Sequence, residues 1–105
     1  MVIVHPSCRC EIAALSDEIR GDLADAVARL DAGLAVSMPL SRPMPVIGRG
    51  AHELRLKYRS GEYRVVYALV GPGSVMLVHA FKKTTRTTAT RNIETARRRV
   101  REGRG

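Results

Sequence analysis

The sequence is poor in aromatic residues: it has no tryptophan, one phenylalanine and three tyrosines among its 105 residues. So few rings provide no evident platform on which single-stranded bases could stack. Two cysteines, Cys8 and Cys10, are too few and too close together for a disulfide framework, which favours a reducing compartment. No apolar run approaches the roughly 18 residues of a membrane span, and the start MVIVHPS lacks the features of a secretory signal. We therefore expect a cytoplasmic protein without a membrane segment.

Several catalytic patterns are also missing from the sequence. It has no glycine-rich phosphate loop, no paired carboxylates in a plausible site and no Ser/His/Asp set. The three histidines lie in different predicted elements, and His5 with Cys8 and Cys10 falls short of the four ligands that a structural metal site uses. We therefore predict neither a metal site nor a cofactor.

Positive charge is the strongest compositional signal. Lys and Arg number 18 against 10 Asp and Glu, giving a net charge of +8. Residues 82–105 alone carry nine basic and two acidic side chains, a net charge of +7. This concentration predicts a polyanionic partner, and nucleic acid is the first candidate because phosphate neutralisation gives affinity for any sequence. A solvated basic helix that only confers solubility is the alternative.

The first half of the chain predicts a short strand and two helices. The β-branched run at residues 2–4 is typical of a strand, and helices are expected at about residues 7–15 and 16–32. Ser7 and Ser16 are the predicted helix caps, and Gly33 the predicted stop. Three prolines within residues 33–50 predict a connection there, because proline disfavours both a helix and a central strand.

The second half predicts a three-stranded antiparallel meander and a final helix. Residues 52–58 alternate, with Glu53, Arg55 and Lys57 facing outward, while residues 63–70 are apolar on both faces apart from Arg64, as in a central strand. A third strand is expected at residues 75–81, and a basic amphipathic helix at about residues 90–102, capped by residue 88 or 90. We expect a single α+β domain over residues 1–105, with its helices on one face of a mostly antiparallel sheet.

Arg64 is the most informative single residue. It shares a strand face with Val66 and Ala68, where an unpaired buried charge would be costly. Its guanidinium is therefore expected either to pair with Glu53 or Glu62, or to present a planar fork to a phosphate.

Other cations are expected near Arg64. Arg55 and Lys57 on the neighbouring strand would lie within about 5–8 Å across an antiparallel pair, although, taken alone, both are more typical of solvated strand positions than of ligands. The run at residues 81–86 adds cations and hydroxyls after the third strand, and such a group could stabilise the transition state of phosphoryl transfer without a metal. His79 alternates with apolar residues in the third strand and is therefore expected near the core. It could serve there either as a structural histidine or as a proton carrier.

Four segments of the second half resemble the phage-derived HigB-like branch of the RelE/ParE toxin superfamily. That branch reads "G-x-x-x-x-E-L-R", then "Y-R-V-x-Y", and then "L-H-G-F-x-K-K-T-x-K-T-P-x-x-E-I-E-x-A" over the third strand and the tail. The matching segments here are Gly48 to Leu56, Gly61 to Tyr67, Val78 to Ala89 and Ile93 to Ala96. The resemblance implies the superfamily's RelE-like α+β fold and the toxin of a type II toxin–antitoxin pair. Its usual activity is ribosome-dependent mRNA cleavage, in which the 2′-hydroxyl of the RNA attacks the adjacent phosphate.

Site residues carry over from the family position by position. Arg64 matches the arginine thought to bind the scissile phosphate, and Arg55, Lys83 and His79 match further residues of the family's motifs. These four are the predicted catalytic residues. The predicted nucleic-acid-binding residues are Lys57, Lys82, Thr85, Arg86 and Arg91.

The chain also departs from the family pattern. Thr84 replaces the second motif lysine, and no tyrosine follows Tyr67, so the C-terminal acid–base tyrosine of some relatives is missing. Two alternatives therefore stay open: a ParE-like inhibitor of DNA gyrase without nuclease activity, and a non-enzymatic nucleic-acid-binding module. The expected partners are mRNA, the ribosome and a helix-turn-helix antitoxin encoded nearby, which could cover the basic face in a hetero-oligomer.

Overall fold

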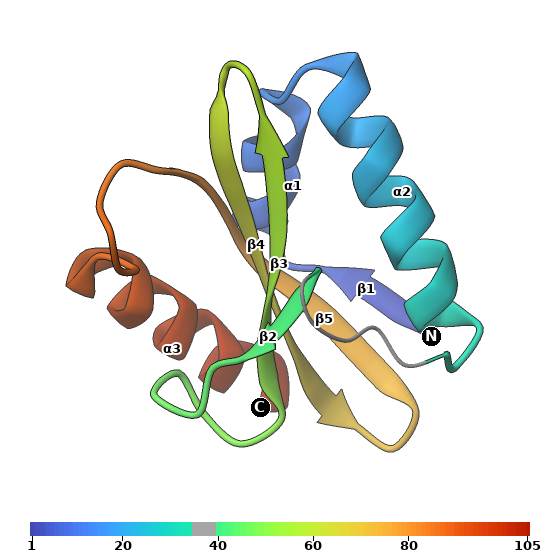
Figure 1. Ribbon diagram of the computed structural model, residues 1–105. Coiled ribbons are helices and arrows are strands. Elements are labelled where there is room, and N and C mark those ends of the chain that lie inside the picture. Colours follow the sequence, from blue (N-terminus) through green and yellow to red (C-terminus); the bar gives the residue numbers. More distant parts are fainter. Residues whose placement is uncertain (35–39) are drawn as a thin grey trace.

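The computed structural model describes residues 1–34 and 40–105, and residues 35–39, part of the predicted connection, lie outside it. Along the described chain, a short strand and two helices are followed by four consecutive strands and a final helix (Figure 1). The elements are β1 (Val2–Val4), α1 (Pro6–Ala13), α2 (Asp17–Asp31), β2 (Ser41–Pro43), β3 (Ala51–Tyr58), β4 (Gly61–Gly71), β5 (Ser74–Lys83) and α3 (Thr90–Arg104). This order confirms the predicted α+β class. None of the described helices is long and apolar enough to cross a membrane.

Local capping explains where the first two helices begin and end. The predicted cap Ser7 is wrong: α1 begins after His5, whose Nδ1 accepts a hydrogen bond from the Ser7 backbone N–H at 3.1 Å. Ser16 caps α2 as predicted, and its hydroxyl accepts a hydrogen bond from a backbone N–H in the first turn at 3.3 Å. Two backbone hydrogen bonds close the end of α2 around Gly33, whose φ of 77° suits glycine.

The strands form one sheet in the order β1-β5-β4-β3-β2. β3, β4 and β5 are the predicted antiparallel meander, with β4 at the centre. β1 pairs with β5 in parallel, Val2 opposite Val75. β2 was not predicted: it is a three-residue edge strand within the proline-containing connection, and Ser41 lies opposite Leu54. An edge position tolerates proline because no second neighbour needs its missing N–H.

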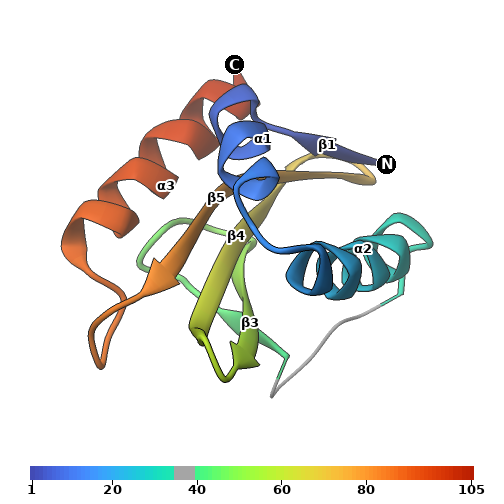
Figure 2. The ribbon, with the colours of Figure 1, turned by 90° about the horizontal axis from the view of Figure 1, so that it is seen from above.

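Helices cover both faces of the sheet, so the expectation of a single covered face is wrong (Figure 2). The core beneath α1 and α2 includes Cys8, Ile19, Leu23, Ala26, Leu54, Leu56, Val65, Tyr67 and Leu77. The core beneath α3 includes Met44, Ile47, Val66, Ala68, Met76, Val78, Ala96 and Val100. Because successive residues of β4 point to opposite faces and both sets are apolar, each face needs a helical cover.

The final helix is basic on its outer face, as predicted, but it begins without a side-chain cap. Its N-terminal cap position is Ala89, and the Thr88 hydroxyl donates instead to Oε2 of Glu53 at 2.9 Å. Ala96 and Val100 bury the inner face of α3. The arginines at positions 91, 97, 98 and 101 are exposed.

Candidate functional site

The strand register aligns the predicted cations in two rows across the sheet. Arg55 of β3 lies opposite Arg64 of β4. In the next row, Glu62 of β4 lies between Lys57 of β3 and Lys83 of β5. Because the rows are two residues apart, both occupy the same face of the sheet, the face on which α3 packs. They lie close to the turn between β3 and β4 (Figure 1).

Three cations from three neighbouring strands converge on the carboxylate of Glu62. Its Oε2 accepts a hydrogen bond from Nη2 of Arg64 at 3.0 Å and lies 3.7 Å from Nζ of Lys83. Its Oε1 lies 3.6 Å from Nζ of Lys57. Loss of hydration by itself raises the pKa of Glu62, but the charges of Arg64, Lys57 and Lys83 outweigh this effect and hold the pKa below its ordinary value. We call Glu62 and these three cations the Glu62 cluster.

Arg64 is almost completely buried and pairs with both carboxylates that the sequence suggested. Its Nε lies 3.2 Å from Oε1 of Glu53, and the two side chains are 1% and 2% exposed. The predicted outward position of Glu53 is therefore a buried one. Among the described residues, neither Nε nor Nη1 of Arg64 has a hydrogen-bond partner, so the contact of Nε with Glu53 is an ion pair and the guanidinium retains two buried nitrogens with free donors. Glu53 thus holds Arg64 from the inside while Glu62 holds it from the solvent side, where the Glu62 side chain is 37% exposed.

Arg55 lies beside Arg64 but also borders a separate cavity. This open hollow of about 370 Å³ lies between α2 and β3, and its lining includes Arg55, Lys57, Tyr58 and acidic residues of α2. Arg64 and Lys83 are not among its lining residues. Lys57, Arg64 and Lys83 therefore meet at the Glu62 carboxylate, and the four predicted cations do not share one hollow.

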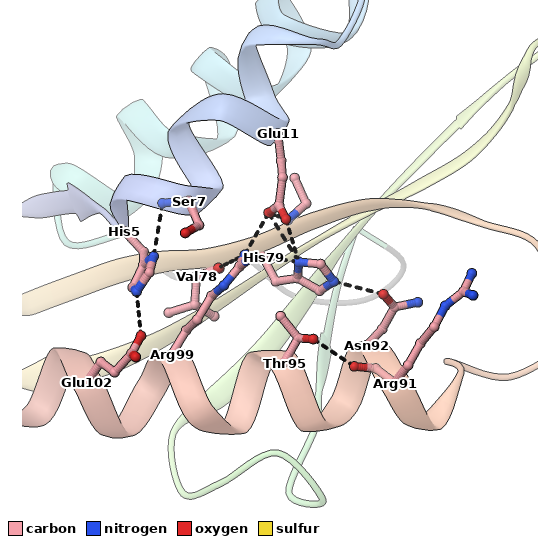
Figure 3. Close-up of polar contacts among 11 residues, drawn as sticks. His5, Ser7, Glu11, Val78, His79, Arg91, Asn92, Thr95, Arg99 and Glu102 are labelled. Atoms are coloured by element: carbon pink, nitrogen blue, oxygen red, sulfur yellow. Dashed lines mark hydrogen bonds and ion pairs between the residues drawn. The ribbon is translucent and has the colours of Figure 1, made fainter.

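His79, a predicted catalytic residue, lies in a buried polar cluster (Figure 3). Its side chain is 9% exposed, with Nδ1 3.1 Å from Oε1 of Glu11 and Nε2 2.8 Å from Oδ1 of Asn92. Nη1 of Arg99 donates to the same Glu11 oxygen at 2.8 Å. These contacts join α1, β5 and α3. Such a set of contacts is typical of a structural histidine, which is one of the two roles that the sequence suggested for His79.

Glu11, at the centre of this polar cluster, and Arg99 also form hydrogen bonds with backbone groups at the free edge of β5. The Ala80 N–H donates to Oε1 of Glu11 at 3.0 Å, and Arg99 donates to the Val78 carbonyl at 2.9 Å. Both backbone groups lie beyond the pairing with β1 and would otherwise form an unpaired strand edge. Burial alone raises the pKa of Glu11, but hydrogen bonds from Arg99 and Ala80, together with His79, lower it below its ordinary value.

The other predicted nucleic-acid-binding residues lie outside the Glu62 cluster. Lys82 points to the opposite face from Lys83, and its Nζ is 6.0 Å from the centre of the Tyr63 ring. Thr85 and Arg86 are exposed after β5, where the Thr85 hydroxyl donates to the Thr87 carbonyl. Arg91 is exposed in the first turn of α3. The residues that the structure describes include no group of His, Cys, Asp and Glu side chains able to hold a metal ion.

Comparison with known proteins identifies the family. Residues 10–101 match the family described as "Phage derived protein Gp49-like (DUF891)". The chain belongs to this family. No curated protein matches this Gp49-like chain.

The fold of this Gp49-like protein is similar to a solved structure, that of the isolated E. coli RelE toxin. The TM-score is 0.57 at 18% sequence identity, and the similarity covers 93% of this chain and 96% of the other. At this identity the likeness establishes the fold. The predicted RelE-like α+β fold is therefore confirmed, whereas membership of the HigB-like branch stays a prediction.

Sequence reasoning did not foresee several residues that shape the two polar clusters of this Gp49-like protein. Glu62 was considered only as a partner of Arg64, although Lys57 and Glu62 flank a tight turn and therefore face each other. Glu11, Asn92 and Arg99 were not identified at all. Glu11 and Arg99 are 88 residues apart in the sequence, so no local pattern links them.

Proposed function

We propose that this protein is the toxin of a type II toxin–antitoxin system and that it cleaves mRNA on the ribosome. The observation that carries the proposal is the convergence of Lys57, Arg64 and Lys83, from three strands, on one anionic group. The RelE-like fold and the basic outer face of α3 agree with a polyanionic substrate.

The proposed reaction is a transesterification within the RNA. The 2′-hydroxyl oxygen attacks the adjacent phosphorus, and the bond from phosphorus to the 5′-oxygen breaks. The products are a 2′,3′-cyclic phosphate and a 5′-hydroxyl. The attacking hydroxyl loses one proton and the leaving 5′-oxygen gains one, so the protons balance. Arg64 and Lys83 stabilise the negative charge that develops on the phosphate oxygens, with Lys57 and Arg55 beside them. We assign His79 a positioning role, because both ring nitrogens already have partners within the fold.

The proposed partners follow from the charge distribution. Exposed arginines of α3 and the loop before it give this side of the molecule affinity for RNA phosphates of the message and the ribosome. A helix-turn-helix antitoxin, encoded beside this gene and acting with it in the cytoplasm, would cover the same surface with an acidic or apolar segment.

The proposal is tested in a purified translation system programmed with a defined mRNA. Primer extension should reveal ribosome-dependent cuts with the wild-type protein and few or none with the double variant Lys57→Met/Lys83→Met. These two lysines are better test positions than Arg64, because Arg64→Ala also removes a buried ion pair. Inhibited translation with intact mRNA would reject cleavage. Poisoned gyrase with intact mRNA would favour the gyrase alternative, and RNA binding without growth arrest would favour the binding module.

A further inference from the structure

The carboxylate of Glu62 occupies the position that the proposed site reserves for an anion. Its two oxygens divide the three cations between them, Arg64 and Lys83 on Oε2 and Lys57 on Oε1. A phosphodiester likewise carries one negative charge shared by two oxygens, and cations that satisfy the carboxylate can satisfy these oxygens in the same way.

Glu62 can leave this position without a rearrangement of the fold. Its side chain is 37% exposed and that of Lys57 is 66% exposed, so both have room to change rotamer toward solvent. Arg64 would stay in place, because it is 1% exposed and Glu53 still holds its Nε from the buried side. In this site the guanidinium of Arg64 is therefore held in place, whereas the carboxylate of Glu62 can move away.

We propose that Glu62 is an internal competitor of the RNA phosphate: its carboxylate must be displaced from Lys57, Arg64 and Lys83 before a phosphodiester binds there. This inference rests on the proposed function for the identity of the anion. Its consequence is that Glu62 limits RNA affinity and favours substrates whose binding is reinforced elsewhere, as it would be on a ribosome.

The charges of the site agree with competition rather than proton transfer. Three cations of the Glu62 cluster face one carboxylate, so displacement of Glu62 raises the net charge that these side chains present to the RNA from +2 to +3. The same cations lower the pKa of Glu62, despite the opposing effect of desolvation, and thereby make it a weak base.

The test is the affinity of the purified protein for a short single-stranded RNA, measured by fluorescence anisotropy over a range of salt concentrations. Glu62→Gln should bind about three- to tenfold more tightly than the wild type. Glu18→Gln makes the same charge change at an exposed position of α2, on the opposite face of the sheet, and is the matched control, expected to change affinity less than twofold.

A second variant protects the test against misfolding. Glu62→Asp keeps the charge but shortens the reach to the cations, so it should also bind RNA more tightly than the wild type, by less than Glu62→Gln. Thermal unfolding verifies that both variants are folded.

The possible outcomes separate the inference from the proposed function. If the Glu62 variants bind no more tightly than Glu18→Gln, or if no protein binds RNA, the inference is overturned. If Glu62→Gln binds like the wild type but no longer cuts mRNA, Glu62 is a proton carrier and the inference is equally wrong. If the Glu62 variants bind more tightly while the wild type cuts no mRNA, the competition stands and only the proposed nuclease function fails.

Discussion

Replacement of Glu53 by glutamine should destabilise the protein strongly. The carboxylate of Glu53 and the guanidinium of Arg64 are 2% and 1% exposed and lie 3.2 Å apart. Removing one member of a buried pair leaves the other charge insufficiently compensated, at a cost of about 3–5 kcal/mol. Because 1 kcal/mol shifts the Tm of a domain of this size by roughly 4–8 °C, the variant should melt at least about 12 °C below the wild type.

The assay is thermal and urea unfolding followed by circular dichroism, with two comparison variants. Glu62→Gln removes the partly exposed partner of the same arginine and should lower the Tm less than Glu53→Gln. The double variant Glu53→Met/Arg64→Met removes both charges at similar volume and should recover most of the lost stability. A Tm for Glu53→Gln within about 3 °C of the wild type would refute the reasoning, because Arg64 would then have no need of its buried partner.

Three further results are expected. A thiol reagent at pH 8 should modify exposed Cys10 and spare Cys8, because burial and then the charge of Glu11 raise the pKa of Cys8 to about 12; equal labelling of both would contradict this. The folded-state pKa of Glu11 is depressed, so its contribution to stability is present above about pH 4.5 and is lost as the pH falls through the folded-state value. Between pH 7 and pH 3, the wild type should therefore lose more free energy of unfolding, measured by urea titration, than Glu11→Gln does. Equal losses in the two proteins would contradict a stabilising role of the Glu11 carboxylate. Lys83→Met should weaken RNA binding severalfold with little change in Tm, and unchanged binding would remove Lys83 from the site.

The strand and helix pattern was predictable because it depends on local periodicity. The alternation in β3, the two apolar faces of β4 and the cap at Ser16 can all be seen within short windows of sequence. The distribution of helices over the two faces could not be seen in this way. Apolar residues on both faces of β4 require two covers, but which helix supplies each cover depends on tertiary packing. β2 could not be predicted, because a three-residue edge strand that contains proline has almost no local sequence signal.

The candidate site was predictable in part for the same reason. Antiparallel register places Arg55 opposite Arg64, and the resemblance of the motifs singled out Lys83. The extent to which these cations are already neutralised depends on rotamers and burial, which single-sequence patterns do not specify. His79 illustrates the limit: its contacts with Glu11 and Asn92 depend on two helices that pack against β5 from different parts of the chain.

The chemistry of the cut ends tests the central claim most directly. Fragments of an mRNA translated with the wild-type protein should be isolated and their termini determined by mass spectrometry and enzymatic end-labelling. Cleavage by the 2′-hydroxyl predicts upstream fragments that end in a 2′,3′-cyclic phosphate and downstream fragments that begin with a 5′-hydroxyl, all absent with Lys57→Met/Lys83→Met. Fragments with 3′-hydroxyl and 5′-phosphate ends, or no fragments while translation stops, would contradict the account.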